Sequence, residues 1–169
     1  MKTVFLDRDG TINVDHGYVH KIEDWEFTPD APAAIALLKS QGFTVVVVTN
    51  QSGIGRGMYS IEDARNLNDD ANNLLKAYNA EVEHWLLCPH APKDDCNCRK
   101  PKTGMVDGLF YLEDSWMVGD KSSDIEFGKN IGASTIKLPN KSDEECDADY
   151  YEKTLLDAAL LITSVNAIL

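Results

Sequence analysis

Val4-Phe5-Leu6-Asp7-Arg8-Asp9-Gly10-Thr11 carries the strongest prediction of fold in the sequence. A short apolar run ends in two aspartates separated by one residue, and Gly-Thr follows. The run predicts a strand over residues 3–6 that delivers its last side chains to the edge of a sheet, where ligands bind in open α/β folds. A simple turn is the alternative for the polar residues, because Asp, Gly and Thr favour turns.

Similar strands recur along the chain, separated by helices. Residues 44–49 are β-branched throughout, which is typical of a strand buried on both faces of a parallel sheet. Further strands are expected at residues 81–87, 115–118 and 134–138. Helices are expected at residues 30–41 with Asp30 as N-cap, 60–78 with Ser60 as N-cap, 104–112, 124–131 and 151–169. This alternation predicts a three-layer, Rossmann-like α/β fold, a parallel sheet with helices on both faces.

Size and charge narrow the classes of function. The 169 residues predict one domain, residues 1–169. Acidic residues exceed basic ones by 28 to 16, and the net charge of −12 argues against nucleic acid or an anionic membrane as the main partner. Since no apolar run is long enough to span a bilayer and no signal-peptide pattern is present, a cytoplasmic enzyme is expected, and we expect a monomer.

The ends of the predicted strands bring reactive groups together. Four residues each follow a predicted strand, and such ends meet at one edge of a parallel sheet: Asp7, Thr49, Cys88 and Asp120. Asp7 suits a nucleophile that attacks phosphorus, and Asp9 suits a general acid and base for the leaving oxygen and the attacking water. Asp7, Asp9 and Asp120 offer the oxygen ligands that Mg²⁺ prefers.

Cations and polar groups elsewhere fit an anionic substrate. Thr49-Asn50-Gln51-Ser52 offers a hydroxyl and backbone N–H groups to phosphate oxygens, although a plain strand-to-loop transition also explains it. Lys100 is suited to pair with phosphate and with the nucleophilic carboxylate, and Arg99 to hold a second anionic group. Lys121 is a candidate to reach substrate, whereas Asp124 reads as a first-turn acid that the helix dipole favours.

The cysteines form a metal-type pattern, C-x-H followed by C-x-C. Three thiolates and one imidazole within residues 88–102, the zinc loop, predict a closed tetrahedral Zn²⁺ site of structural type: Cys88, His90, Cys96 and Cys98. Iron–sulfur binding matches this set poorly, and four unrelated reduced side chains are the plain alternative. Cys146 has no partner nearby in the sequence and is expected to be a plain thiol.

Four motifs in order resemble those of the haloacid dehalogenase superfamily of aspartate-dependent phosphatases: DRDGT (7–11), TNQS (49–52), CRKPK (98–102) and GDKSSD (119–124). Within it, residues 5–20, residues 49–57 and the zinc loop look like the phosphatases that remove the 7-phosphate of D-glycero-D-manno-heptose 1,7-bisphosphate, in carbohydrate metabolism leading to lipopolysaccharide precursors. The resemblance extends to about Leu138.

The resemblance implies a Mg²⁺-dependent reaction through an aspartyl-phosphate. Asp7 would be the nucleophile and Asp9 the general acid and base, with Thr49 and Lys100 stabilising the transferring phosphoryl group. Mg²⁺ would be held by Asp7, the Asp9 carbonyl and Asp120.

It also implies how the substrate is recognised. Arg99 would bind the other phosphate of the sugar. A flap, residues 12–30, and two other segments would contact the sugar: Asp15, His16, Gly17, Tyr18, Asn50, Gln51, Ser52 and Lys121. The family lacks a large cap domain, so the zinc loop would form a wall of the site.

Two alternatives stay open. The spacing of residues 88–102 is also close to that of histidinol-phosphate phosphatases, which share the aspartates and the zinc. The DHGY block at 15–18 and the Gly-Arg-Gly turn at 55–57 favour the heptose substrate. A non-catalytic module that binds through the zinc loop is the alternative from another class, and the intact aspartates weigh against it.

Overall fold

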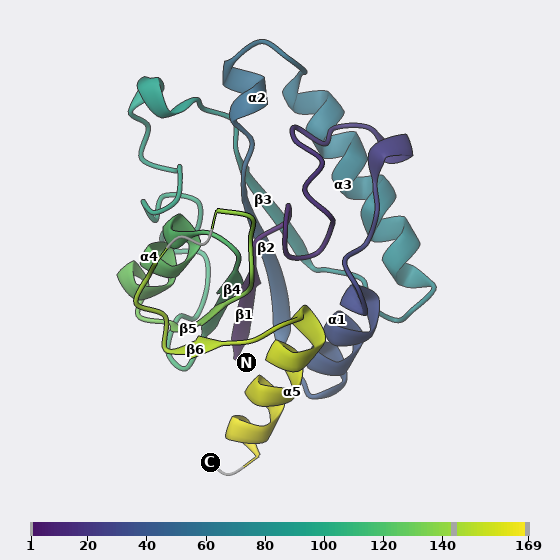
Figure 1. Ribbon diagram of the computed structural model, residues 1–169, viewed down its shortest axis with the longest axis vertical. Helices are drawn as coiled ribbons and strands as arrows, with labels where there is room; N and C mark the ends of the chain where they lie inside the picture. Colours follow the sequence, from purple (N-terminus) through teal and green to yellow (C-terminus); the bar gives the residue numbers. More distant parts are fainter. Residues whose placement is uncertain (1, 143–144, 168–169) are drawn as a thin grey trace.

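A computed structural model describes residues 2–142 and 145–167, in which six parallel strands form one sheet in the order β3-β2-β1-β4-β5-β6 (Figure 1). The strands are β1 (Thr3–Leu6), β2 (Thr44–Asn50), β3 (His84–Cys88), β4 (Trp116–Gly119), β5 (Ser134–Lys137) and β6 (Tyr150–Tyr151). The predicted parallel pairing is confirmed for every neighbouring pair. The predicted domain and the predicted C-terminal helix also include residues 1, 143–144 and 168–169, which lie outside the described residues.

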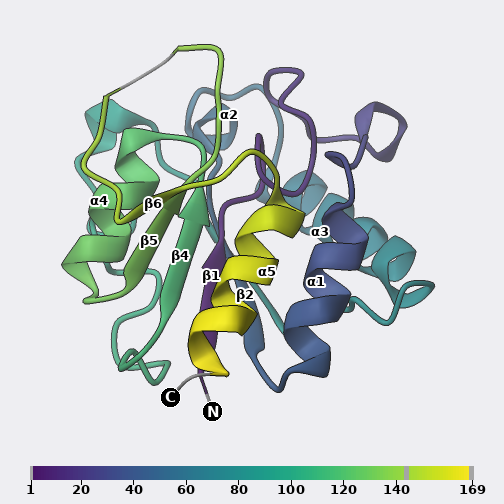
Figure 2. The same cartoon turned by 60° about the horizontal axis from the view of Figure 1, so that its bottom comes forward.

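Helices cover both faces of this sheet. They are α1 (Ala31–Ser40), α2 (Ser52–Gly55), α3 (Ile61–Lys76), α4 (Ser122–Asn130) and α5 (Leu155–Asn166), with short 3-10 turns η1 (Ile22–Asp24) and η2 (Pro92–Asp94). Helices α1 and α5 lie side by side against one face, and α4 packs on the other (Figure 2). The expected three-layer arrangement is therefore confirmed.

The alternation of side chains along β1 divides the core. Val4 and Leu6 are buried in the cluster that includes α1 and α5, whereas Phe5 is buried in the opposite cluster with Phe127 of α4. Successive residues of a strand point to opposite faces, so a continuously apolar strand serves both clusters. The polar residue that follows β1 is thereby left at the edge of the sheet.

Asp30 occupies the predicted N-cap position of α1, and its carbonyl accepts the N–H of Ala34 at 2.9 Å, but its backbone is left-handed with φ of 60° and its side chain makes no capping hydrogen bond. One predicted helix is absent. Residues 104–112 form turns rather than a helix. Gly108 adopts φ of 70° within them, and Met105 and Val106 are buried against the face that carries α4. Burial of these apolar side chains, rather than a helix, explains the spacing.

One strand and one helix begin three or more residues later than predicted. The third strand begins at His84 rather than residue 81, because the Glu83 carboxylate accepts the N–H of Val45 and takes the place of a backbone partner. The predicted helix at 151–169 starts at Leu155, after strand β6 at the sheet edge and a Thr154 N-cap. The predicted Ser60 cap is confirmed.

Candidate functional site

Three buried carboxylates, the acidic cluster, gather at the carboxyl edge of the central strands. Asp7 follows β1, Asp120 follows the neighbouring strand β4, and Asp124 lies in the first turn of α4. Their oxygen atoms lie within 4.8 Å of one another. Gly10, with φ of 86°, lies so close that a Cβ there would overlap the Asp120 carboxylate. The predicted convergence of Asp7 and Asp120 is thus present, and Asp124 joins them.

Lys100 connects the zinc loop to the acidic cluster. Its buried ammonium lies 2.8 Å from Asp7 Oδ1 and 2.6 Å from Asp124 Oδ1. Burial opposes the charged form, but the carboxylates of Asp124 and Asp7 outweigh it and raise the pKa of Lys100. Both backbone polar groups of Lys100 pair with the side-chain amide of Asn50, at 2.9 and 3.1 Å. The end of the zinc loop is therefore fastened to the end of β2.

The charges of the acidic cluster are incompletely balanced by the protein. Burial and then the neighbouring carboxylates raise the pKa of Asp7 to about 6 and that of Asp120 to about 8. Asp120 Oδ1 is buried and has no hydrogen-bond partner among the described residues. Hard oxygen ligands with an unpaired inward oxygen and excess negative charge fit a divalent cation such as Mg²⁺.

Asp9 is held separately from the acidic cluster. Arg8 is fully buried and spans both carboxylate oxygens of Asp9, with Nε 3.1 Å and Nη2 3.0 Å away. Asn13 and Gln51 donate further hydrogen bonds of 3.0 and 2.9 Å. Burial alone would raise the pKa of Asp9, but the Arg8 charge and these hydrogen bonds lower it. In this arrangement Asp9 is an ionised, fixed carboxylate.

A cavity of about 290 Å³ opens beside these groups. Eleven of the predicted site residues line it: Asp7, Asp9, Asp15, Gly17, Tyr18, Asn50, Gln51, Ser52, Arg99, Lys100 and Lys121. Arg99 brings a buried Nη1 that has no partner among the described residues, so this nitrogen is available to an anionic group. At the mouth, Lys121 lies 3.7 Å from Asp15 of the flap.

Apart from the zinc ligands, three predicted site residues do not line the cavity. Asp120 and Thr49 are buried at strand ends behind it, where Thr49 accepts a hydrogen bond from Gln51. His16 is exposed and pairs with Glu26 at 2.8 Å, pointing its ring nitrogen to another flap residue. A sugar contact by His16 is therefore not favoured by this conformation.

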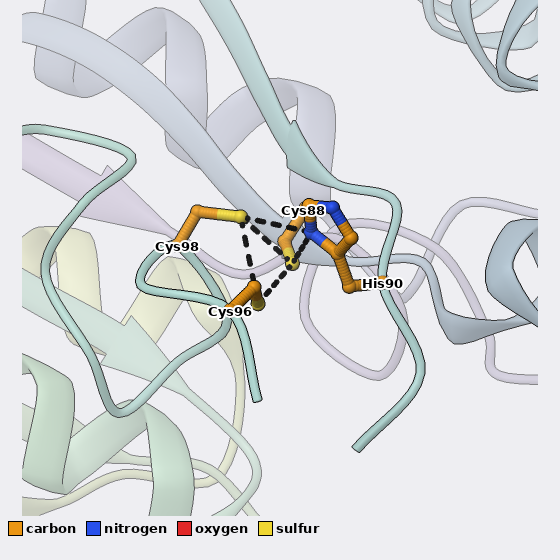
Figure 3. A group of neighbouring side chains, drawn as sticks. All are labelled: Cys88, His90, Cys96 and Cys98. Atoms are coloured by element: carbon orange, nitrogen blue, oxygen red, sulfur yellow. Dashed lines mark hydrogen bonds between the residues drawn. The ribbon is translucent and has the colours of Figure 1, made fainter. Parts of the chain in front are cut away.

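The four predicted zinc ligands, the thiol cluster, meet at the start of the zinc loop. Cys88 ends β3, His90 follows it, and Cys96 and Cys98 return from the far side of the loop (Figure 3). Five separations between their Sγ and Nδ1 atoms run from 3.1 to 3.7 Å. Tetrahedral ligands placed about 2.3 Å from Zn²⁺ are about 3.8 Å apart. The donor set and its spacing therefore fit one zinc ion.

One thiol of this cluster is already biased toward the thiolate. Burial acts to raise its pKa, but backbone hydrogen bonds at Arg99 and Cys98 and contacts with the other thiols lower the pKa of Cys96 to about 7. A thiolate is the form that binds a metal.

Sequence reasoning missed three residues of the site. Asp124 was assigned only a helix-terminal role. Its place four residues after Asp120, in the first turn of the next helix, could have indicated that it lies near Asp120. Arg8 lies between the two aspartates, but nothing in the sequence showed that it turns inward to Asp9. Tyr59 lines the cavity from the loop after α2 and had no sequence signal at all.

Comparisons with known proteins find that the chain is similar to phosphatases. A family model described as Polynucleotide kinase 3 phosphatase matches residues 2–154. The D-glycero-beta-D-manno-heptose-1,7-bisphosphate 7-phosphatase of Pseudomonas putida is 36% identical over 174 residues, covering 99% of this chain and 97% of that protein. The D-glycero-alpha-D-manno-heptose-1,7-bisphosphate 7-phosphatase of Photorhabdus laumondii is 38% identical over 144 residues, covering 78% and 79%.

The fold is also shared with a solved structure. The D,D-heptose 1,7-bisphosphate phosphatase from B. bronchiseptica, complexed with magnesium and phosphate, superposes with a TM-score of 0.89 at 28% identity, covering 98% of this chain and 99% of that one. As in the sequence-based expectation, no large cap domain stands over the sheet edge in residues 2–142 and 145–167.

Proposed function

The chain belongs to the D,D-heptose 1,7-bisphosphate phosphatase family of the haloacid dehalogenase superfamily, and we propose that it removes the 7-phosphate of D-glycero-D-manno-heptose 1,7-bisphosphate. The observation that carries this proposal is the placing of Asp7 at the cavity edge, within an acidic cluster and paired with Lys100. A carboxylate nucleophile needs a cation beside it to approach an anionic phosphate.

The proposed reaction has two steps. An Asp7 oxygen attacks phosphorus, the bond from phosphorus to the sugar oxygen breaks, and Asp9 gives a proton to that oxygen. Water then attacks the aspartyl-phosphate, Asp9 takes the proton from the water, and inorganic phosphate leaves with the Asp7 carboxylate restored. Because Asp9 is ionised in the resting arrangement, it must gain a proton before the first step.

Asp7, the Asp9 carbonyl and Asp120 would hold Mg²⁺, with Asp124 beside them. When bound, Mg²⁺ supplies positive charge that reduces repulsion between carboxylates and phosphate. Lys100 keeps Asp7 oriented and offers its ammonium to the transferring phosphoryl group, and Thr49 offers its hydroxyl.

The substrate would enter between the flap and the zinc loop. Asp15, Gly17 and Tyr18 line the cavity from the flap, and Arg99 from the zinc loop, so a sugar with phosphates at both ends can be held at two points. The free nitrogen of Arg99 suits the second phosphate. We propose that residues 1–169 act as a single catalytic domain and that the protein is a monomer.

Zn²⁺ would bind the thiol cluster and serve the structure of the zinc loop, since four protein ligands close the site. Zn²⁺ would affect the reaction indirectly, by fixing the position of Lys100, which lies two residues beyond Cys98. Among the described residues, none of the helices has the length and apolar character that crossing a membrane requires.

The test compares substrates at equal enzyme concentration. We expect a higher kcat/KM on heptose 1,7-bisphosphate than on histidinol phosphate, and a higher value on the latter would move the assignment to the alternative. The α and β anomers should be assayed separately, because the relatives' names differ at this carbon. Absence of turnover on all of them would favour the non-catalytic module.

A further inference from the structure

Gln51 lies between two groups of the proposed reaction and is fully engaged by the protein. It is buried, and its Nε2 donates to Asp9 Oδ2 at 2.9 Å and to Thr49 Oγ1 at 2.8 Å. Its Oε1 accepts the hydroxyl hydrogen of Tyr59 at 2.6 Å. Both amide hydrogens are therefore used, and no donor of Gln51 remains for a substrate.

The contacts around Gln51 give its amide one orientation. Both Asp9 oxygens already accept hydrogen bonds from Arg8, which can only donate, and the NH₂ group of Gln51 faces Asp9 while its oxygen faces Tyr59. Tyr59 must then donate. Because Thr49 accepts a hydrogen from Gln51, its own hydroxyl hydrogen is left for another acceptor, which in the proposed reaction is a phosphoryl oxygen.

Tyr59 is itself fixed on two sides. Its ring stacks on His20 of the flap, with centroids 4.5 Å apart and planes 3° from parallel. On another side the ring occupies the space that a Cβ of Gly53 would need. Burial raises the pKa of Tyr59 to about 12, so the hydroxyl keeps its hydrogen near neutral pH.

We propose that Tyr59 and Gln51 are positioning residues, in which the Tyr59 hydroxyl fixes the Gln51 amide so that it aligns both Asp9 and Thr49. This inference rests on the proposed function and replaces the sugar-binding role expected for Gln51. It also couples the flap, through His20 and Tyr59, to the two groups that act on the leaving oxygen and the phosphoryl group.

The decisive variant is Tyr59→Phe, which keeps the ring and removes only the hydroxyl. Without its partner the amide is free to turn, and Asp9 and Thr49 lose alignment. We expect kcat on heptose 1,7-bisphosphate to fall about tenfold, with KM changed less than about twofold, since the lost contact is equivalent to one hydrogen bond. Tyr78→Phe, at an exposed tyrosine whose hydroxyl makes no hydrogen bond among the described residues, is the matched control and should match the parent.

A second substrate separates positioning from general loss of structure. p-Nitrophenyl phosphate has a leaving group that needs no proton, so alignment of Asp9 matters less to the first step on this substrate, which kcat/KM reports, and the loss that remains is that of Thr49. We expect kcat/KM on it to fall less than about threefold in Tyr59→Phe. Gln51→Met should reproduce both values, and the double variant should lose no more than Gln51→Met alone.

Other outcomes overturn the inference. A raised KM with unchanged kcat would make these residues substrate contacts. Equal losses on both substrates would show that the pair does not align Asp9, and multiplying losses in the double variant would make the two residues independent. A parent enzyme that turns over neither substrate would overturn the proposed function, and this inference with it. An active parent with an unaffected Tyr59→Phe would overturn the inference alone.

Discussion

The acidic cluster and the thiol cluster are both suited to a metal ion, but the chain builds them in opposite ways. The thiol cluster comes from residues 88–98, one short loop at the end of β3. The acidic cluster needs residues that follow β1 and β4 and the first turn of α4. A locally built site can be read from spacing alone, whereas a site built from several strands can be read only after the fold is known.

The sharpest way to break this comparison is Asp7→Asn. The amide cannot attack phosphorus, so we expect kcat to fall about 10³-fold or more, while zinc content stays at one per chain because the thiol cluster is built independently. Steady-state assays and metal analysis of the same preparation check both parts. Substantial turnover in this variant would remove Asp7 from the reaction.

Cys96→Ser tests the opposite site. Loss of one zinc ligand should lower Tm by about 10 °C and reduce activity in the same preparation, because structural zinc contributes folding free energy and the loop carries Lys100. Calorimetry, zinc analysis and kcat measure these effects. Cys146→Ser is the matched control and should alter none of them. Parent protein purified without stoichiometric metal would contradict the zinc assignment.

These two variants also mark what the sequence allows one to predict. The alternation of strands and helices placed Asp7 and Asp120 together, and the C-x-H and C-x-C spacing placed the thiol cluster. Asp124 was assigned to its helix terminus, which is correct but incomplete, because its second role depends on Lys100 arriving from a loop 24 residues earlier. Tyr59 could not be found, since its role depends on a tertiary contact with Gln51. The helix predicted at residues 104–112 was wrong because apolar side chains buried against the face that carries α4 happen to have the spacing of an amphipathic helix.

The acidic cluster should make the stability of the fold depend on pH. The pKa of Asp7 is raised to about 6 and that of Asp120 to about 8, chiefly by burial. A carboxyl with a raised folded-state pKa stabilises the fold below its unfolded pKa, and this stabilisation is lost as pH rises through the folded pKa. We expect Tm of Mg²⁺-free protein to drop by about 5 °C between about pH 5 and about pH 8, and Mg²⁺ to restore most of it.

Thermal unfolding of protein freed of Mg²⁺ by dialysis, with its zinc content checked, and of the same protein with added Mg²⁺ measures this effect. Asp120→Asn removes one titrating group and should flatten the dependence. A Tm that rises over the same range in the Mg²⁺-free parent would show that the carboxylates are not the destabilising groups.

The smallest expected effect is at the cavity, where Lys121 and Asp15 lie 3.7 Å apart. Both side chains are partly exposed, so their pair contributes little to stability. Lys121→Ala should raise KM about threefold by removing a cation near the phosphate, with Tm unchanged within about 1 °C. Kinetics at low and high salt check it, and a fall in kcat without a change in KM would place Lys121 in the chemistry instead.

The missing side chain at Gly10 has a consequence for how such enzymes are recognised and altered. A single methyl group at position 10 would displace the Asp120 carboxylate on the neighbouring strand while leaving every charge in the chain intact. A variant that keeps all the carboxylates but replaces this glycine would keep the charged groups of the acidic cluster and lose their arrangement. The position of the Asp120 carboxylate therefore depends on the absence of a Cβ atom at residue 10.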